Sequence, residues 1–221
     1  FANDMIGWYS VQVNANDVAC CGAKPRWFLA TLLVPPDYQE YQIKSIFKQI
    51  VKACESLDIS LIGGHTEVTN SLNRPIISGC MLGETEKSTY VTTSGAKEGD
   101  SILMTKGIAI EGTALLARDA EQNLLKRGIS ETVIESSKEL LFRPGISVVR
   151  ESLKVCSSVT VHSLHDPTEG GLTTGLYEIA YASNSGLTID IENVPIIHET
   201  QIICTALGLN PLGLLASGAL I

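Results

Sequence analysis

The stretch Val13-Asn14-Ala15-Asn16-Asp17-Val18-Ala19, followed by Gly22-Ala23-Lys24-Pro25, is the part of the sequence that decides the fold. Apolar residues recur three or four positions apart from residue 5 to residue 21, which predicts a helix that ends before Gly22. Asn16 and Asp17 interrupt this apolar pattern. A buried carboxylate is costly unless it is paired or binds a metal ion, so Asp17 is a candidate site residue, with capping of a loop as the alternative.

The residues that follow predict strands and a helix of a mixed sheet. Residues 26–34 are almost all apolar, which predicts a strand buried on both faces. Residues 38–57 carry one apolar stripe opposite lysines and a glutamate, which predicts a long amphipathic helix. Short strands are expected at 59–62, ending at Gly63-Gly64, and at 75–83. This order indicates an α/β or α+β sheet packed on helices.

A small, polar, glycine-rich segment at residues 94–100 is the best candidate for a linker. After it we expect strands at 101–105, 159–164 and 187–191. Helices are expected from about 113, at 130–142 and 146–157, from the turn at 165–171 to about 182, and at 199–207.

Two more polar clusters interrupt apolar elements. The cluster Gly63-Gly64-His65-Thr66-Glu67 lets the backbone approach a ligand closely, with a hydroxyl for a phosphate and a carboxylate for a metal ion. The cluster from His165 to Gly171 lies at the start of a helix, where free N–H groups favour anions. An ordinary strand turn and simple helix capping are the respective alternatives.

The overall composition is that of a globular protein with an acidic balance. The 221 residues carry a net charge of −8, from 24 acidic and 16 basic residues, with no basic stripe. Nucleic acid is therefore not an expected partner. An acidic protein that binds a polyphosphate must screen it with a divalent cation. No apolar run is long enough to cross a membrane and no signal peptide is visible, so the cytoplasm is the expected location.

The cysteines indicate free thiols, and the two ends of the chain indicate a fragment. The six cysteines form no C-x-x-C pair and most lie in apolar runs, which predicts buried free thiols. The chain begins without methionine and stops after an apolar run, which we interpret as a fragment truncated at both ends.

Taken together, these motifs resemble the aminoimidazole-ribonucleotide-synthetase (PurM-like) superfamily. The stretch from Val13 to Pro25 resembles its V-N-x-x-N-D-(L/V)-A-x-x-G-A-x-P signature, and residues 63–67 resemble its G-G-(D/H/E)-T block. Residues 166–172 and 206–212 resemble D-P-T-R-G-G-L and C-x-x-L-G-L-D-P-L of the hydrogenase expression/formation branch. The resemblance runs in the right order from about residue 13 to residue 215.

The resemblance implies a two-domain α/β architecture and an ATP-dependent activity. It implies an N-terminal ATP-binding and dimerisation domain at residues 1–95, whose sheet forms a β-barrel across a homodimer, and a C-terminal α/β domain at 96–221. The implied cofactors are ATP and Mg²⁺. The implied reaction is the dehydration of a protein thiocarboxamide to a thiocyanate during hydrogenase maturation, with a carbamoyltransferase and a metallochaperone scaffold as further partners.

The same resemblance assigns roles to individual residues. It implies that Asp17 and His65 are catalytic and that Asp17 and Glu67 hold the metal ion. The implied nucleotide contacts are Asn16, Gly63, Gly64, Thr66, Asp166, Thr168, Gly170 and Gly171.

Two residues and two segments depart from the hydrogenase pattern. His65 stands where that branch normally has Asp, and Glu169 replaces its usual Arg. The upstream acidic and glycine-rich block and the branch's C-terminal cysteine are outside this chain. The alternatives are phosphoryl transfer like that of selenophosphate synthetase or thiamine-monophosphate kinase, a non-catalytic nucleotide-binding assembly protein, and a metal site built on His162 and His165.

Overall fold

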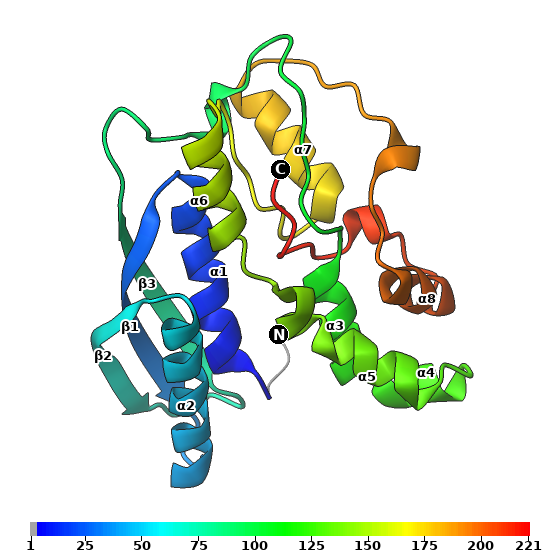
Figure 1. The fold of residues 1–221 in the computed structure, drawn as a ribbon. Coiled ribbons are helices and arrows are strands. Elements are labelled where there is room, and N and C mark those ends of the chain that lie inside the picture. Colours follow the sequence, from blue (N-terminus) through cyan, green and yellow to red (C-terminus); the bar gives the residue numbers. More distant parts are fainter. Residues whose placement is uncertain (1–3) are drawn as a thin grey trace.

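Helix α1 (Ile6–Cys20) lies in the middle of the computed structural model, which describes residues 4–221. One side of α1 packs against a small sheet and the other faces the second part of the chain (Figure 1). Its buried residues therefore surround the helix instead of forming one stripe, and they include the polar Gln12 and Asn16. The predicted helix at 5–21 is confirmed.

The sheet contains β1 (Lys24–Val34), β2 (Ser60–Val68) and β3 (Ile76–Glu84) in the order β2-β1-β3. Strand β1 is parallel to β2 and antiparallel to β3. The parallel pair is connected by α2 (Glu40–Ser56), because parallel strands need a long crossover. The mixed α/β class predicted from the sequence is confirmed.

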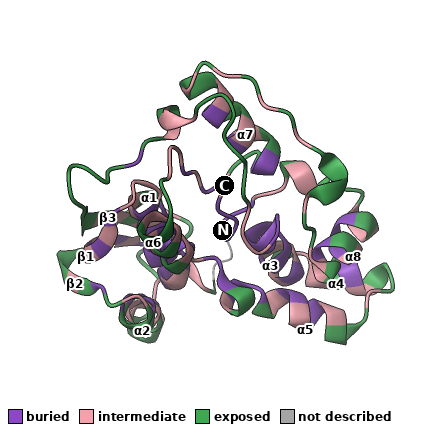
Figure 2. Cartoon of the chain, turned by 45° about the horizontal axis from the view of Figure 1, so that its top comes forward, coloured by how far each residue is buried: buried purple, intermediate pink, exposed green. Residues whose placement is uncertain are grey.

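The two faces of the sheet differ in their covering. Phe28, Ala30, Leu32 and Val34 alternate along β1 and are buried in a core with residues of α1 and α2. The opposite face carries exposed apolar side chains, including Ile76 and Leu82 on β3, which are 42% and 47% exposed. In Figure 2, α1 and α3 carry many buried residues, whereas β2 and β3 carry mainly exposed ones.

Strand β2 is longer than predicted. The expected strand ended at Gly63-Gly64, whereas the structure continues β2 to Val68. The pairing of β1 with β2 shifts between Phe28 and Leu29, next to the two glycines. A Cβ on Gly64 would come within 1.9 Å of the Ala30 carbonyl oxygen, so glycine lets the strands approach without ending the pairing.

The second part of the chain is mainly helical. Its helices are α3 (Ile110–Asp119), α4 (Glu121–Lys126), α5 (Glu131–Glu139), α6 (Val149–Ser158), α7 (Gly171–Ala182) and α8 (His198–Leu207). Short helical turns span Thr93–Gly95, Leu141–Gly145, Ile191–Asn193 and Pro211–Gly213. Ala117, Leu124, Ile134 and Ile203 form one core that joins α3, α4, α5 and α8.

The three strands predicted at 101–105, 159–164 and 187–191 are wrong. These segments do not form the successive backbone hydrogen bonds of a β-ladder, although isolated hydrogen bonds occur at or beside them. The Thr105 N–H donates to the Leu220 carbonyl (3.0 Å), and His165 and Ile221 exchange two backbone hydrogen bonds of 3.0 and 2.8 Å. An extended segment becomes a strand only through successive hydrogen bonds to a neighbour, which composition alone does not reveal.

The cysteines are all free, as predicted, but not all buried. Cys54 and Cys204 are buried, whereas Cys80 is exposed because it lies on the uncovered face of β3. Within residues 4–221, none of the helices has the length and apolar character needed to cross a membrane.

The buried Asn16 side chain connects α1 to the second part of the chain. Its Nδ2 donates to the Ile146 carbonyl and its Oδ1 accepts from the Val148 N–H, each at 2.8 Å. The Ser152 hydroxyl donates to the Ala19 carbonyl at 2.6 Å and fixes α6 beside α1. These hydrogen bonds replace the solvation that the buried groups lose.

Replacing Asn16 with leucine is expected to lower the free energy of unfolding by roughly 2 to 4 kcal/mol, because two buried backbone groups lose their partners. Urea denaturation followed by circular dichroism measures the change. Asn73→Leu, at an exposed position, is the control and is expected to change stability by less than about 0.5 kcal/mol. Equal losses in both variants would contradict the structural role of Asn16.

Candidate functional site

Asp17 projects from the last turns of α1 toward the segment that precedes α7. The residue is exposed and not buried as the sequence suggested, but partial desolvation still raises the pKa of its carboxyl, the Glu169 carboxylate adds to the rise, and His165 opposes it. The structure therefore brings Asp17 together with the cluster at 165–171, as the sequence prediction requires.

Asp166 lies beside α1 and is only 5% exposed. Its Oδ1 accepts a hydrogen bond from the Cys20 Sγ at 3.3 Å, and no residue from 4 to 221 offers its Oδ2 a partner. Burial raises the pKa of Asp166 to about 6, and the carboxylate of Asp17 contributes in the same direction. A buried carboxyl with an unused oxygen is characteristic of binding sites, because the fold alone does not repay its desolvation.

Glu111, in the first turn of α3, is a member of this cluster that the sequence prediction missed. Its side chain is 1% exposed, and its Oε1 has no partner within the described chain. Burial raises the pKa of Glu111 to about 7, and the carboxylates of Glu169 and Asp166 raise it further. The signal was present in the sequence, since Glu111 interrupts an apolar run just as Asp17 does.

The turn at residues 168–171 is shaped by glycines. Gly170 and Gly171 have φ angles of +79° and +64°, a region that other residues rarely adopt. The Gly171 N–H donates to the Thr168 carbonyl at 3.0 Å, which closes the turn before α7. A Cβ on Gly171 would lie 2.5 Å from the Leu212 carbonyl oxygen, so this glycine also permits close packing of the chain.

Asn16 is placed differently from Asp17, although the two are adjacent. Its side chain is fully buried and both ends of its amide already bond the backbone at residues 146 and 148. The structure gives Asn16 a role in the fold, and a nucleotide contact from this residue stays a prediction.

The predicted site residues of β2 lie away from the cluster around Asp17. His65 and Glu67 pair with Thr31 and Leu33 of β1, so they lie on the sheet face opposite the buried side of β1. The His65 Nε2 and Glu67 Oε2 are 3.3 Å apart, and both side chains are more than half exposed. Gly63, Gly64 and Thr66 are exposed on the same strand.

The donor chemistry near Asp17 fits Mg²⁺, although no preformed metal cluster is present. Within residues 4–221, no three His, Cys, Asp or Glu side chains come close enough to hold a metal ion by themselves. Mg²⁺ usually takes one or two carboxylates and completes its coordination with water and phosphate oxygens. Asp17 and the unused oxygen of Asp166 supply this kind of ligand.

The two histidines of the alternative metal site contact two different carboxylates. The His162 Nδ1 lies 2.9 Å from Asp100 Oδ1, and the His165 Nε2 lies 2.6 Å from Glu178 Oε2. They therefore do not share one set of acidic neighbours.

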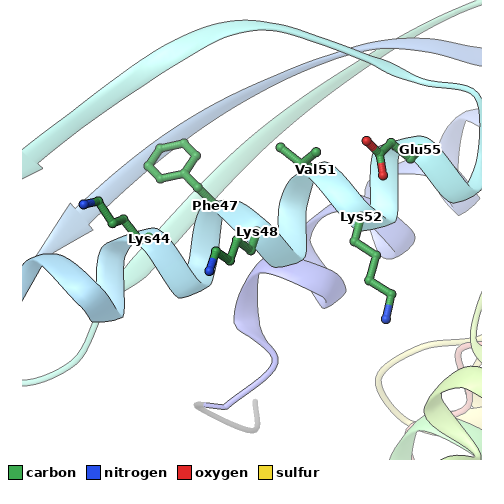
Figure 3. Close-up of a pocket in the computed structure, with 6 residues that line it drawn as sticks. All are labelled: Lys44, Phe47, Lys48, Val51, Lys52 and Glu55. Atoms are coloured by element: carbon green, nitrogen blue, oxygen red, sulfur yellow. The ribbon is translucent and has the colours of Figure 1, made fainter.

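A shallow hollow of about 390 Å³ lies on α2, away from all these residues (Figure 3). It is lined by Lys44, Phe47, Lys48, Val51, Lys52 and Glu55. None of the predicted site residues contributes to it.

Glu111→Gln is expected to make the protein more stable at neutral and alkaline pH. The pKa of Glu111 is raised in the folded state from about 4.5 to about 7. Ionisation therefore destabilises the fold as the pH rises through this window, and the penalty is absent below it. Above it, the variant should gain up to roughly 3 kcal/mol in free energy of unfolding. Urea denaturation between pH 4 and pH 8 measures the difference. Parallel stability profiles for variant and wild type would contradict the assignment.

Known proteins match this chain along its whole length. The family "AIR synthase related protein, N-terminal domain" matches residues 1–85, and "AIR synthase related protein, C-terminal domain" matches residues 97–221. A Methanocaldococcus jannaschii protein named for hydrogenase expression and formation is 30% identical over 222 residues, covering 100% of this chain and 62% of that protein. The carbamoyl dehydratase HypE of Cupriavidus necator is 28% identical over 223 residues, covering 100% and 60%.

Solved structures agree with this relationship. The hydrogenase maturation protein HypE in complex with ATP has a TM-score of 0.76 at 24% identity, covering 97% of this chain and 61% of that one. The thiamine-monophosphate kinase of Aquifex aeolicus has a TM-score of 0.80 at 22% identity, covering 100% and 72%. These likenesses support the fold, whereas the two family matches together span nearly all of the sequence. The chain belongs to the AIR synthase related protein family.

Proposed function

We propose that this chain is the nucleotide-activating part of an ATP- and Mg²⁺-dependent enzyme of hydrogenase maturation. The reaction is the ATP-dependent dehydration of a protein thiocarboxamide to a thiocyanate. The main support is the match of the whole chain to a carbamoyl dehydratase and to a hydrogenase expression and formation protein. The chain spans 62% and 60% of these relatives, so the remaining parts of such an enzyme lie outside it.

The acidic cluster around Asp17 supports a role in metal binding. ATP carries a negatively charged triphosphate, which the carboxylates of Asp17 and Glu169 would repel in the absence of a cation. Bound Mg²⁺ supplies positive charge that stabilises a transferring phosphoryl group. Asp17 and Asp166 would hold the ion, and the turn from Thr168 to Gly171 would contact the nucleotide.

The proposed architecture has a first domain at residues 1–95 and a second at 96–221. Residues 1–3 of the first domain lie outside the described part of the structure. Further maturation proteins are the proposed partners, including a carbamoyltransferase and a metallochaperone scaffold. One similar solved structure is a complex of HypE with HypF, which supports partners of this kind.

Asp17→Asn is expected to reduce Mg²⁺-dependent ATP turnover of the full-length protein on the order of a hundredfold, because the amide removes a charged metal ligand. Phosphate release measured with and without Mg²⁺ tests this. Asp37→Asn, at an exposed position before α2, is the control and should retain activity. Unchanged turnover in Asp17→Asn would reject the site. Binding of Mg²⁺-ATP without turnover by the wild type would favour a non-catalytic assembly protein.

A homodimer formed through the uncovered sheet face is part of the same proposal. Its support is the exposed apolar surface of β3 beside the half-buried Leu29 and Leu33 of β1. Exposed apolar residues grouped in this way favour association. In such a dimer, His65 and Glu67 would lie at the interface and not in open solvent.

Leu82→Asp is expected to convert a dimer of the full-length protein into monomers, because a charge would replace an exposed apolar side chain of this face. Analytical ultracentrifugation measures the mass. Tyr41→Asp, on the exposed side of α2, is the control and should leave the mass unchanged. A dimer that persists in Leu82→Asp would place the interface elsewhere.

A further inference from the structure

The outward side of α2 carries a basic and apolar surface in a chain that is acidic overall, and we call it the α2 surface. It consists of the residues that line the shallow hollow of about 390 Å³, which are Lys44, Phe47, Lys48, Val51, Lys52 and Glu55 (Figure 3). Within α2, the lysines form one row with a spacing of four residues, and the other three residues form a second row with the same spacing. Three lysines and one glutamate give this surface a net charge of +2, whereas the whole chain carries −8.

The apolar stripe of α2 is wider than the area that the rest of the described chain covers. Ile46, Ile50 and Cys54 of this stripe are buried in the core that α2 shares with α1 and β1. Phe47, one position further round the helix, is only half-buried, and Val51 is 42% exposed. A solvated helix face normally carries polar residues, so Phe47 and Val51 form an apolar edge that a partner could cover.

The lysines beside this apolar edge are available to an anionic partner. Lys44 forms an ion pair of 2.7 Å with Glu40, but both side chains are more than two-thirds exposed, and such pairs are weak. Lys48 and Lys52 are exposed, and among residues 4–221 no carboxylate forms an ion pair with either of them. All three ammonium groups can therefore meet carboxylates of a bound molecule.

Charge and shape select one class of occupant. A second copy that used the same surface would place lysines against lysines, which charge repulsion opposes. An anionic membrane would attract the three lysines but repel a chain with a net charge of −8. Small-molecule sites enclose most of their ligand, whereas this hollow is shallow and lies on a single helix. A protein segment with carboxylates beside an apolar row complements both rows.

We propose that the α2 surface docks an acidic amphipathic helix of a partner protein. Apolar side chains of that helix pack on Phe47 and Val51, and its carboxylates, one helical turn apart, pair with Lys48 and Lys52. The inference goes beyond the proposed function, because none of these residues belongs to the candidate site. Figure 1 shows α1 between α2 and the helices α3 and α5, so a helix bound to α2 leaves the cluster around Asp17 accessible.

The test measures binding of a fluorescein-labelled synthetic peptide to the full-length protein by fluorescence anisotropy. The peptide of about 20 residues is held helical by a side-chain staple and carries leucines at helical spacing with glutamates beside them. A twin peptide has glutamine in place of each glutamate. At low ionic strength the wild type should bind the acidic peptide at least about tenfold more tightly than the glutamine twin. This ratio should shrink at about 0.5 M salt, because salt screens exposed charges.

Substitutions assign the binding to the α2 surface. Lys48→Glu/Lys52→Glu should weaken the acidic peptide at least about tenfold and should bind a lysine twin of the peptide more tightly than the wild type does. Val51→Asp should weaken the acidic and glutamine peptides alike, because both share the apolar row. The control Lys126→Glu/Lys154→Glu makes the same charge change at exposed positions of α4 and α6 and should stay within about twofold of the wild-type affinity.

Several outcomes would overturn the inference. It fails if the wild type does not prefer the acidic peptide, or if the two lysine double variants lose the same affinity. Binding to phosphatidylserine vesicles without binding to the peptide would make this surface a membrane site. A changed mass of Lys48→Glu/Lys52→Glu without peptide binding by the wild type would make it a contact between copies of the chain. Mg²⁺-ATP turnover should be unchanged in these variants, so failure of the docking inference leaves the proposed function standing.

Discussion

The rest of the structure depends on the buried amide of Asn16, which fixes α1 between the sheet and the second part of the chain. The amide bonds the backbone on both sides of Ser147, so α1 cannot slide or rotate without breaking two buried hydrogen bonds. The hydrogen bonds from Ser152 to Ala19 and from Cys20 to Asp166 follow the same side of the helix. A polar stripe on an otherwise buried helix thus determines where the candidate site forms.

Next to α1 lie two buried carboxyl groups that do not favour folding. Glu111 and Asp166 lose their hydration and keep unused oxygens, and their raised pKa values express this cost. Apolar residues of similar size would give a more stable core. Groups that lower the stability of the fold usually occur where a protein binds a ligand or catalyses a reaction. Here they lie close to the motif residue Asp17, and one of them, Asp166, is itself a motif residue.

Different parts of this picture were accessible from the sequence for different physical reasons. The helices at 6–20 and 40–56 and the buried strand β1 follow from apolar periodicity and run length, which local sequence encodes. The extended segments at 101–105 and 159–164 have strand-like composition but lack neighbours with which to form a ladder. The meeting of Asp17 with the cluster at 165–171 was predictable from ordered motifs. Glu111 was missed because its burial depends on packing between distant segments.

The predicted site residues fall into two groups that lie apart in one chain. In one chain, Asp17 lies near Glu169 and Asp166, whereas His65 and Glu67 lie on the sheet face opposite the buried side of β1. Glu169, where the hydrogenase branch normally has arginine, adds negative charge instead of a cation. A triphosphate beside Asp17 therefore needs a cation in between, since the chain offers carboxylates at this point.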